Sequence, residues 1–437
     1  MIDRLYIAAT SQHVGKTTST LGLMAAIRAR GHKVSYCKPV GQEFVELGEL
    51  RVDKDALLFD DILFTDRARE EHQQLCAVFE RVVGKPEAVL QIGALLRETF
   101  EDADAGADAR AWFVAELSRA LPARNYARYE TDLLALDPDA LDRFAVTGQS
   151  PLPLVAPPLP NLLFTRDLCA VVGSHVVMSR AATDARRRES VIVEAILRHH
   201  PRFAANRDQL FVLPDYVSFE GGDLLVVNES LVLIGQAERT SLGGVMAVTE
   251  RLLAETPVTD VLMVNLPNKR SCMHLDTVFT FIDDETCMGY PPIIARERHN
   301  GFHFSEYDAT TAGGGRFQTR VLPSVQVAIE ELTGHPFTFI PCGGADPLNQ
   351  EREQWTDGAN LFAVAPNLVL AYERNRHTFA ALRDQGFHVV NAEHFLSFYE
   401  NCTVTVGEKV ALQLTGHELS SGRGGARCMT MPLVREG

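Results

Sequence analysis

Near its C-terminal end the 437-residue chain carries Ser421-Gly422-Arg423-Gly424-Gly425-Ala426-Arg427-Cys428-Met429-Thr430-Met431-Pro432. Three glycines predict a loop that can approach a ligand closely, because no Cβ blocks the way. Two arginines flank Cys428, and a thiol near guanidinium charge, or near a cationic substrate, loses its proton more easily to give the nucleophilic thiolate. A lone cysteine is commonly a small buried hydrophobe. A nucleophilic role therefore depends on partners elsewhere in the chain.

Three further groups of polar residues offer such partners. They are Pro160–Asp167, then Phe219–Asp223 with Ile234–Thr240, and Met273–Thr277. We expect each at the end of a strand, with His274 and Asp276 on one face because alternate residues of a strand share a face. Each group alone is ambiguous, since an Arg-Asp pair is commonly solvated and Glu-Gly-Gly-Asp is a common turn. Together they predict one site.

The residue types in this predicted site suit a planar, cationic substrate. His274 can act as a general acid and base near neutral pH. Carboxylates can hold a guanidinium by paired hydrogen bonds, and arginines can bind a carboxylate at the other end of the substrate. The candidate carboxylates are Asp167, Glu220 and Asp276, and the candidate arginines are Arg186, Arg239 and Arg423.

Composition limits the classes of function. The net charge of −15 argues against nucleic acid as a partner, since phosphate binding needs a basic surface. No apolar run approaches the roughly 20 residues of a membrane span, and the first residues lack a signal-peptide pattern. The eight scattered cysteines form no Cys-x-x-Cys pair, which argues against a zinc site. We expect reduced thiols in a cytoplasmic protein and no membrane partner; the sequence does not decide between a monomer and a homo-oligomer.

The N-terminal region has a separate character. An apolar run at 5–9 predicts a strand, Thr10–Thr18 follows as a loop, a helix extends to Gly31, and a second strand covers Lys33–Cys37. Strand, loop and helix are the context of a phosphate-binding loop, although Thr10 stands where the first glycine of that pattern belongs. The candidate nucleotide-binding residues are Gly15, Lys16 and Thr17.

These residues resemble the start of dethiobiotin-synthetase-like P-loop proteins. The likeness extends through Lys38-Pro39-Val40-Gly41 to about Val52–Asp55 and then stops. The remaining parallel strands and acidic magnesium ligands of such a domain are not recognisable downstream. We therefore expect a strand–loop–helix appendage that does not hydrolyse ATP.

The rest of the chain predicts an α/β protein with a helical block. A helix is expected from Asp66 to about Val82, and apolar residues at a period near 3.6 predict helices through 86–150. Five prolines within Pro151–Pro160 mark a boundary. Beyond it, strands are expected at 168–173, 210–214, 224–227, 232–235, 261–266, 278–282, 337–341, 361–364, 368–372 and 404–412, and helices at 187–198, 243–255, 324–333 and 378–385.

Several of these segments are similar to the motifs of arginine deiminases, in the same order. They are Leu57–Asp61, Leu159–Asp167, Glu220–Asp223, Met273–Thr277, Asp357–Asn360, Tyr372–Asn375 and Gly422–Met429. The resemblance implies a five-bladed α/β propeller of ββαβ blades with an inserted helical domain. Together with the P-loop resemblance, it divides the chain into a P-loop-like segment at 1–55, a catalytic domain at 56–75 and 151–437, and the inserted domain at 76–150.

The resemblance also implies a reaction, the hydrolysis of L-arginine to L-citrulline and ammonia. Cys428 would attack the guanidinium carbon, His274 would protonate the departing ammonia, and a covalent thiouronium adduct would then be hydrolysed. No metal and no organic cofactor are implied. Asp167 and Asp276 would clamp the guanidinium, Glu220 would support His274, and the remaining substrate would be bound by Asn161, Arg186, Asp223, Arg239, Gly422 and Arg423.

Alternative functions remain open at this stage. Within the same superfamily these are a methylarginine hydrolase or an amidinotransferase, and outside it an ATP-binding P-loop module or a non-catalytic propeller. Arginine deiminases begin with a His-Arg-Pro-Gly-like turn, whereas this chain has Lys38-Pro39-Val40-Gly41. The chain thus reads as a junction between two families near Asp55–Phe59, which affects the first blade more than the catalytic residues.

Overall fold

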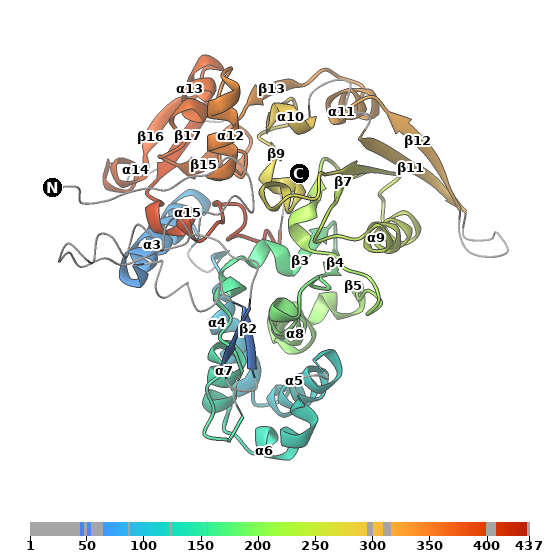
Figure 1. Ribbon diagram of the computed structural model, residues 1–437, viewed down its shortest axis with the longest axis vertical. Coiled ribbons are helices and arrows are strands. Elements are labelled where there is room, and N and C mark those ends of the chain that lie inside the picture. The colour runs from blue at the N-terminus through green and yellow to red at the C-terminus, as the bar shows by residue number, and fades with distance from the viewer. Residues whose placement is uncertain are drawn as a thin grey trace, which may run out of the picture. The chain divides into compact units, whose positions relative to one another are not determined.

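The chain divides into two compact units, Met1–Ile62 and Leu63–Gly437. A computed structural model (Figure 1) describes residues 44–47, 50–53, 64–85, 88–121, 125–154, 156–294, 300–308, 316–398 and 408–434.

The described part of the first unit is a short hairpin. Strand β1 (Phe44–Leu47) pairs antiparallel with β2 (Leu50–Asp53). The predicted strand–loop–helix with Gly15, Lys16 and Thr17 lies outside the described residues, as do Lys38–Gly41 and Leu57–Asp61.

Three sheets of the second unit repeat one ββαβ arrangement. In each, two antiparallel strands are followed by a helix and by a strand parallel to the second. The elements are β3 (Cys169–Val172), β4 (His175–Met178), α8 (Asp184–His199) and β5 (Leu210–Phe211); β6 (Leu224–Val226), β7 (Leu231–Gln236), α9 (Leu242–Glu255) and β8 (Asp260–Asn265); and β9 (Phe279–Phe281), β10 (Thr286–Gly289), α11 (Val325–Thr333) and β13 (Thr338–Pro341).

A fourth sheet extends the same arrangement, and a hairpin enlarges the second sheet. In the fourth, β17 lies between β15 and β16 and is parallel to both. The hairpin β11–β12 joins the second sheet beside β8 and is inserted before α11. The bounds are β14 (Phe362–Ala365), β15 (Leu368–Tyr372), α13 (Arg376–Asp384), β16 (His388–Asn391), α14 (Ala392–Phe398) and β17 (Val410–Leu414), with α10 (Pro291–Ile294), β11 (Gly301–Asp308), β12 (Arg316–Leu322) and α12 (Pro347–Trp355).

Buried side chains explain why the strands read as continuous apolar runs. In β7, Val232 and Ile234 pack in one core cluster, with residues of α9 and the first sheet, while Leu231 and Leu233 pack in another, with residues of α11 and the third sheet. Both faces of β7 are therefore covered, as expected for a strand with no polar alternation. Helix α13 similarly lies in a cluster with residues of the third and fourth sheets. The four sheets thus follow one another with a helix between neighbours.

The remaining helices cover the two ends of this series. Helix α3 (Thr65–Val83) packs with the fourth sheet, and α4 (Ile92–Glu101), α5 (Gly106–Ala120), α6 (Glu130–Leu134) and α7 (Pro138–Thr147) contribute to a core shared with α8 and the first sheet. Figure 1 shows α4–α7 as a helical group beside α8. Helix α7 ends at Gly148, where φ is +74° and an added Cβ would lie 1.9 Å from the carbonyl oxygen of Ala156. Glycine is thus required where the helices meet the proline-rich segment.

The predicted α/β class is confirmed, with most expected elements within a few residues of their predicted bounds. The strands expected from the sequence did not include β1, β2, β4, β10, β11, β12 or β16. Helix α3 runs across the predicted domain boundary at residue 76, and the division into domains stays a prediction. Among the described helices, none combines the length and the apolar character that crossing a membrane requires.

Candidate active site

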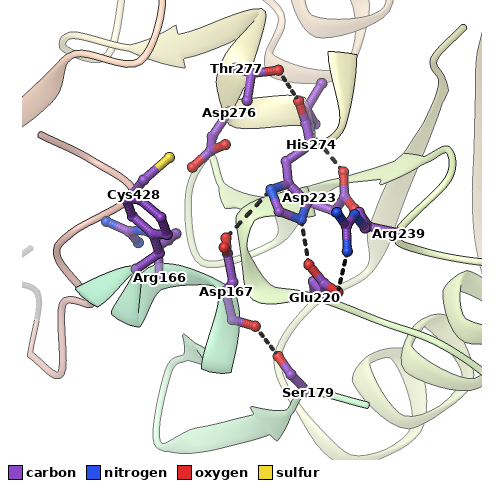
Figure 2. Close-up of polar contacts among 12 residues, drawn as sticks. Arg166, Asp167, Ser179, Glu220, Asp223, Arg239, His274, Asp276, Thr277 and Cys428 are labelled. Atoms are coloured by element: carbon purple, nitrogen blue, oxygen red, sulfur yellow. Dashed lines mark hydrogen bonds and ion pairs between the residues drawn. The ribbon is translucent and has the colours of Figure 1, made fainter. Parts of the chain in front are cut away.

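Short turns that precede the strands bring the predicted site residues together. Asp167 lies before β3, Glu220 before β6, His274 and Asp276 before β9, and Asn360 before β14. These turns come from the same end of four successive sheets. The expectation that His274 and Asp276 share a face of a strand is wrong, because Leu275–Thr277 form a 3₁₀ turn that His274 precedes. This turn aims the two side chains differently, as Figure 2 shows.

His274 lies between two carboxylates and is almost fully buried. Its Nε2 lies 2.8 Å from Oε2 of Glu220, and its Nδ1 lies 3.4 Å from Oδ1 of Asp167 (Figure 2). Burial alone would lower the pKa of His274, but the Asp167 charge and the Glu220 hydrogen bond together raise it to about 10. His274 is therefore a cation at neutral pH, with a proton available on each nitrogen.

Glu220 is held by several cationic groups. Arg186 Nη1 lies 3.6 Å from its Oε2, and Arg239 Nη1 lies 3.9 Å from its Oε1. Burial would raise the pKa of Glu220, but the hydrogen bond to His274 and these positive charges lower it well below its usual range. Glu220 is thus an ionised partner that fixes the orientation of the His274 ring.

Asp223 has both carboxylate oxygens occupied. Oδ1 accepts a hydrogen bond from Leu275 N at 2.8 Å, and Oδ2 accepts one from Thr240 Oγ1 at 2.5 Å. Burial raises its pKa to about 7. Because Leu275 follows His274 directly, Asp223 ties the histidine turn to the start of β6. Gly235 leaves room for this contact, since an added Cβ would lie 2.4 Å from Oδ1 of Asp223.

Asp276 has the opposite environment. Its side chain is fully buried, yet among the described residues neither oxygen has a hydrogen-bond donor. The nearest cation is Arg427, whose Nε lies 3.9 Å from Oδ2. Burial raises the pKa of Asp276. Asp167 Oδ1 also lacks a hydrogen bond from any described group, although its Oδ2 accepts one from Arg186 at 2.5 Å. Unpaired buried carboxylate oxygens are costly and indicate a missing partner.

The cysteine loop is fixed by backbone hydrogen bonds. Asn360 Oδ1 accepts from Cys428 N at 3.1 Å, while its Nδ2 donates to Asp276 O at 2.9 Å. Arg166 N donates to Cys428 O at 3.0 Å, and Tyr372 Oη donates to Gly424 O at 2.7 Å. Asn360 thereby connects the nucleophile candidate directly to the Asp276 turn.

The thiol of Cys428 is buried and points toward the space beside Asp276 (Figure 2). Burial, followed by the negative charges of Asp276, Asp167 and Asp357, raises the pKa of the thiol well above its usual value. The resting cysteine is therefore protonated. A cation placed among these carboxylates would remove the electrostatic part of this effect.

Two glycines of the cysteine loop make close contacts. A Cβ added to Gly424 would lie 2.1 Å from the ring of Phe164, and one added to Gly425 would lie 2.4 Å from Asn360 Oδ1. Arg423 has φ of +68°, and its guanidinium lies over Trp355, 3.5 Å from the ring centroid. Gly422 ends the short helix α15 (His417–Ser421) that precedes the loop.

The predicted substrate-binding residues divide into two groups. Arg186 is buried and already donates to Asp167, Glu189 and the carbonyl oxygen of Asn161. Asn161 and Arg239 are half-buried, and the Nε of Arg239 has no partner among the described residues. The structure thus gathers the predicted residues, while their roles toward a substrate stay predictions.

Two further residues were quoted in the sequence motifs but not predicted as site residues. Asn360 belongs to the Asp357–Asn360 segment, and Tyr372 opens Tyr372–Asn375. Their contacts with the cysteine loop involve backbone atoms, which no residue pattern displays. Their place in the ordered motifs was the signal that could have identified them.

The three residues Asp167, Glu220 and His274 offer ligand atoms within 4.8 Å of one another, close enough for a metal ion. The donor chemistry fits a proton network better. Both nitrogens of His274 face carboxylates that raise the pKa of the ring, and a metal would have to replace a proton that these carboxylates hold on it.

Comparison with known proteins gives a consistent picture. The family model described as "Arginine deiminase" matches residues 55–435. An arginine deiminase from Listeria monocytogenes serotype 4b is 34% identical over 407 residues, covering 87% of this chain and 90% of the relative. The chain belongs to the arginine deiminase family.

A second member of the arginine deiminase family matches over a shorter stretch. An arginine deiminase from Listeria welshimeri is 40% identical over 295 residues, covering 65% of this chain and 64% of the relative. The predicted family and the prediction of an arginine-metabolising hydrolase are therefore confirmed. At the N-terminus, a family model described as "AAA domain" matches residues 3–76, in agreement with the P-loop resemblance there.

Among solved structures, unliganded AgrE matches with 20% identity and a TM-score of 0.40, covering 63% of this chain and 31% of that chain. The N-terminal domain of ArgZ, an arginine dihydrolase from cyanobacteria, matches with 19% identity and a TM-score of 0.40, covering 64% of this chain and 79% of that chain.

Proposed function

We propose that this member of the arginine deiminase family hydrolyses L-arginine to L-citrulline and ammonia through a covalent intermediate on Cys428. The observation that carries the proposal is Asp276, a buried carboxylate with two unpaired oxygens beside the Cys428 loop. A guanidinium offers planar N–H donors that match carboxylates in pairs. Asp276 and Oδ1 of Asp167, which accepts no hydrogen bond from a described residue and lies 3.4 Å from His274 Nδ1, would bind its nitrogens and place its carbon near the thiol.

Substrate binding would also activate the nucleophile. The pKa of Cys428 is raised by burial and by the charges of Asp276 and Asp167. A bound guanidinium neutralises those charges and favours the thiolate. The proton of the thiol passes to solvent, so the reactive thiolate forms only when substrate is present.

The covalent step then follows with all atoms accounted for. The thiolate attacks the guanidinium carbon, and His274 gives a proton to the terminal nitrogen, which leaves as ammonia. A thiouronium joins the carbon to Sγ of Cys428. His274, now neutral, takes a proton from water as the water attacks the same carbon. The C–S bond breaks, the remaining hydroxyl proton passes to the released ammonia or to solvent, and neutral L-citrulline leaves with the thiolate restored.

The other end of the substrate requires a cationic or polar partner. Arg239 and Asn161 are half-buried, and Arg423 and Gly422 lie on the cysteine loop; these residues are proposed to bind the substrate carboxylate. Arg186 is engaged by three carboxylates, so we propose that it supports the site from behind. Asp223 is proposed to act on the substrate through the histidine turn that it holds.

We further propose that the four sheets are blades of the five-bladed propeller implied by the family. Two observations support this. Successive sheets share core clusters through α9, α11 and α13, and Phe164, which precedes the first sheet, packs in the cluster of the fourth. The helices α4–α7 would then be the inserted helical domain.

A second candidate function, nucleotide binding, is favoured by the match of residues 3–76 to an AAA domain. Gly15, Lys16 and Thr17 lie in that range and would cradle phosphates. An increase in melting temperature with ATP and magnesium, absent in Lys16→Ala, would support this function. An identical response in both proteins would refute it.

The proposed reaction is tested by citrulline and ammonia release from L-arginine, with Cys428→Ala as control. We expect equal amounts of both products from the parent protein and none above background from the variant. Parallel assays with a methylarginine, and with arginine plus an amine acceptor, separate the alternative activities. A folded parent protein that releases no citrulline from arginine would contradict the proposal.

A further inference from the structure

One buried carboxylate far from the reacting atoms contacts the segment that leads into the cysteine loop. Glu71 lies on α3 and is 4% exposed. Its Oε1 accepts from His417 N at 3.0 Å and Glu418 N at 3.2 Å. Its Oε2 accepts from Glu418 N at 3.0 Å and Leu419 N at 2.9 Å. Three consecutive backbone N–H groups thus converge on one side chain from a distant part of the chain.

These N–H groups form the first turn of α15 (His417–Ser421), where no preceding residue of the helix can accept their hydrogen bonds. The residue at the N-cap is Gly416, which has no side chain to cap the helix. An added Cβ there would lie 2.0 Å from the ring of Tyr372, so a capping residue cannot replace it. Glu71 supplies the missing cap, and its negative charge suits a helix N-terminus.

Neighbouring contacts fix the same junction. Gln74, one helical turn after Glu71, accepts from Thr415 N at 2.9 Å, and Phe64 N donates to Glu418 Oε2 at 3.0 Å. On the other side of α15, Arg374 donates to Ser420 Oγ. Helix α3 therefore holds the segment 415–419 at three points.

From α15 the chain runs directly through Gly422 and Arg423 to Cys428. Glycine restricts the backbone less than any other residue. The conformation of this glycine-containing loop therefore depends on contacts with residues outside it. Tyr372 and Asn360 support its middle and its end, and Glu71 supports its beginning. We propose that Glu71 is a positioning residue for the nucleophile: it sets the start of the loop and thereby the place of Cys428 beside Asp276.

The inference rests on the proposed function for its consequence, since a displacement of reacting groups by about 1 Å can cost roughly 100-fold in rate. In Glu71→Gln the side chain keeps its length and one acceptor oxygen, but an NH₂ group then faces backbone N–H donors. We expect at least about a 10-fold lower kcat for L-arginine. We also expect a similarly slower alkylation of Cys428 by a haloacetamidine, whose cationic amidine resembles the guanidinium.

Glu353 provides a matched control. It is also a buried glutamate that accepts backbone N–H groups at the start of a helix, from His377 N at 2.9 Å and Thr378 N at 2.7 Å. Glu353 lies on α12, and the helix that it caps, α13 (Arg376–Asp384), leads to β16 and not to the cysteine loop. Glu353→Gln should therefore lower the melting temperature while keeping kcat and the alkylation rate of the folded protein within about 2-fold of the parent.

The experiment measures alkylation rates, kcat and melting temperature for the parent and both variants. Slowed alkylation in Glu71→Gln alone supports the inference. Equal alkylation rates in Glu71→Gln and Glu353→Gln overturn it and make Glu71 a purely structural cap. If Glu71→Gln does not fold, Glu71→Asp takes its place with the same two outcomes. A parent protein that alkylates normally but does not turn over arginine refutes the proposed function and leaves the alkylation comparison decisive for Glu71.

Discussion

Asp223 and Asp276 are both fully buried carboxylates, yet their surroundings differ completely. Asp223 accepts hydrogen bonds from Leu275 N and Thr240 Oγ1, one on each oxygen. Asp276, in the same turn as Leu275, has no donor for either oxygen among the described residues. Burial raises the pKa of both groups. Both residues are aspartates and both are buried, and they differ only in their hydrogen-bond partners.

This difference in hydrogen bonding distinguishes a carboxylate that stabilises the fold from one that is available to a ligand. A buried carboxylate with satisfied oxygens stabilises the fold, whereas one with unpaired oxygens destabilises it unless a ligand supplies the donors. On the proposed function Asp276 binds the cationic substrate, whereas Asp223 holds the histidine turn in place. Substitutions at the two positions should affect opposite properties.

The largest expected effect is the loss of activity in Asp276→Ala. Removing the carboxylate that binds the guanidinium and places its carbon near Cys428 should lower kcat/KM by about 10³-fold or more. The free energy of unfolding should stay unchanged or rise, because a buried carboxylate with no hydrogen-bond donor among the described residues is removed. Citrulline release and urea unfolding measure the two effects. If Asp276→Ala lowers the free energy of unfolding by several kcal/mol, Asp276 is a structural carboxylate like Asp223, and the proposed difference between them is wrong.

Asp223→Ala should instead lower the free energy of unfolding, by about 2–4 kcal/mol, since it leaves the Leu275 N–H unpaired and opens a cavity. Denaturant titration of this variant beside Asp276→Ala gives the direct comparison. Unchanged stability in Asp223→Ala would show that its two hydrogen bonds do not hold the histidine turn.

Stability should also depend on pH through His274. Its pKa in the folded protein is raised to about 10, above the ordinary value of about 6.5. The ionised ring thus stabilises the fold fully below about pH 6.5, and this contribution is lost as pH rises through 10. Urea midpoints should fall between pH 7 and 10 in the parent protein. A comparable fall in His274→Gln would assign the effect to other groups.

A smaller change tests the packing around Asp223. In Gly235→Ala the new Cβ would lie 2.4 Å from Oδ1 of Asp223 and 2.9 Å from Cβ of Leu275. We expect a loss of about 1–3 kcal/mol in the free energy of unfolding, because the carboxylate must move. Gly173→Ala is an informative control, since its positive φ strains the backbone while its added Cβ meets nothing within 4 Å. Because Gly235 has no positive φ, strain of that kind cannot explain its loss, and unchanged stability in Gly235→Ala would show that the carboxylate moves at no cost.

The smallest effect is expected from removal of metal ions. Dialysis against EDTA should leave kcat unchanged within error, because each nitrogen of His274 already pairs with a carboxylate. Loss of activity on dialysis, with recovery on adding a divalent cation, would indicate that the protein binds a metal through Asp167, Glu220 and His274.

The sequence predicted which residues lie together in the structure better than it predicted the strands around them, while the roles of these residues stay predictions. Cys428, His274 and Glu220 stand in short ordered motifs, and the structure places Glu220 and His274 before the first strands of successive sheets and Cys428 in the loop after α15. Apolar runs such as Leu231–Gln236 also predicted their strands, because both faces are buried.

The sequence did not predict features that depend on distant partners. Strand β10, Thr286–Gly289, contains a threonine, a cysteine and a glycine, and it is a strand because β9 and β13 pair with it on either side. Asp223 has hydrogen-bond donors and Asp276 has none among the described residues, and this difference depends on which distant groups lie near each carboxylate. Glu71 looks like an ordinary helix residue until α15 packs against it.

The central claim is that Cys428 attacks a guanidinium held by Asp276 and Asp167. Acid quenching within a single turnover, followed by mass spectrometry, tests it most directly. We predict an adduct on Cys428 with the mass of arginine less ammonia, absent in Cys428→Ala and strongly reduced in Asp276→Ala. Citrulline formation by Cys428→Ala at the parent rate, without an adduct in either protein, would contradict the account.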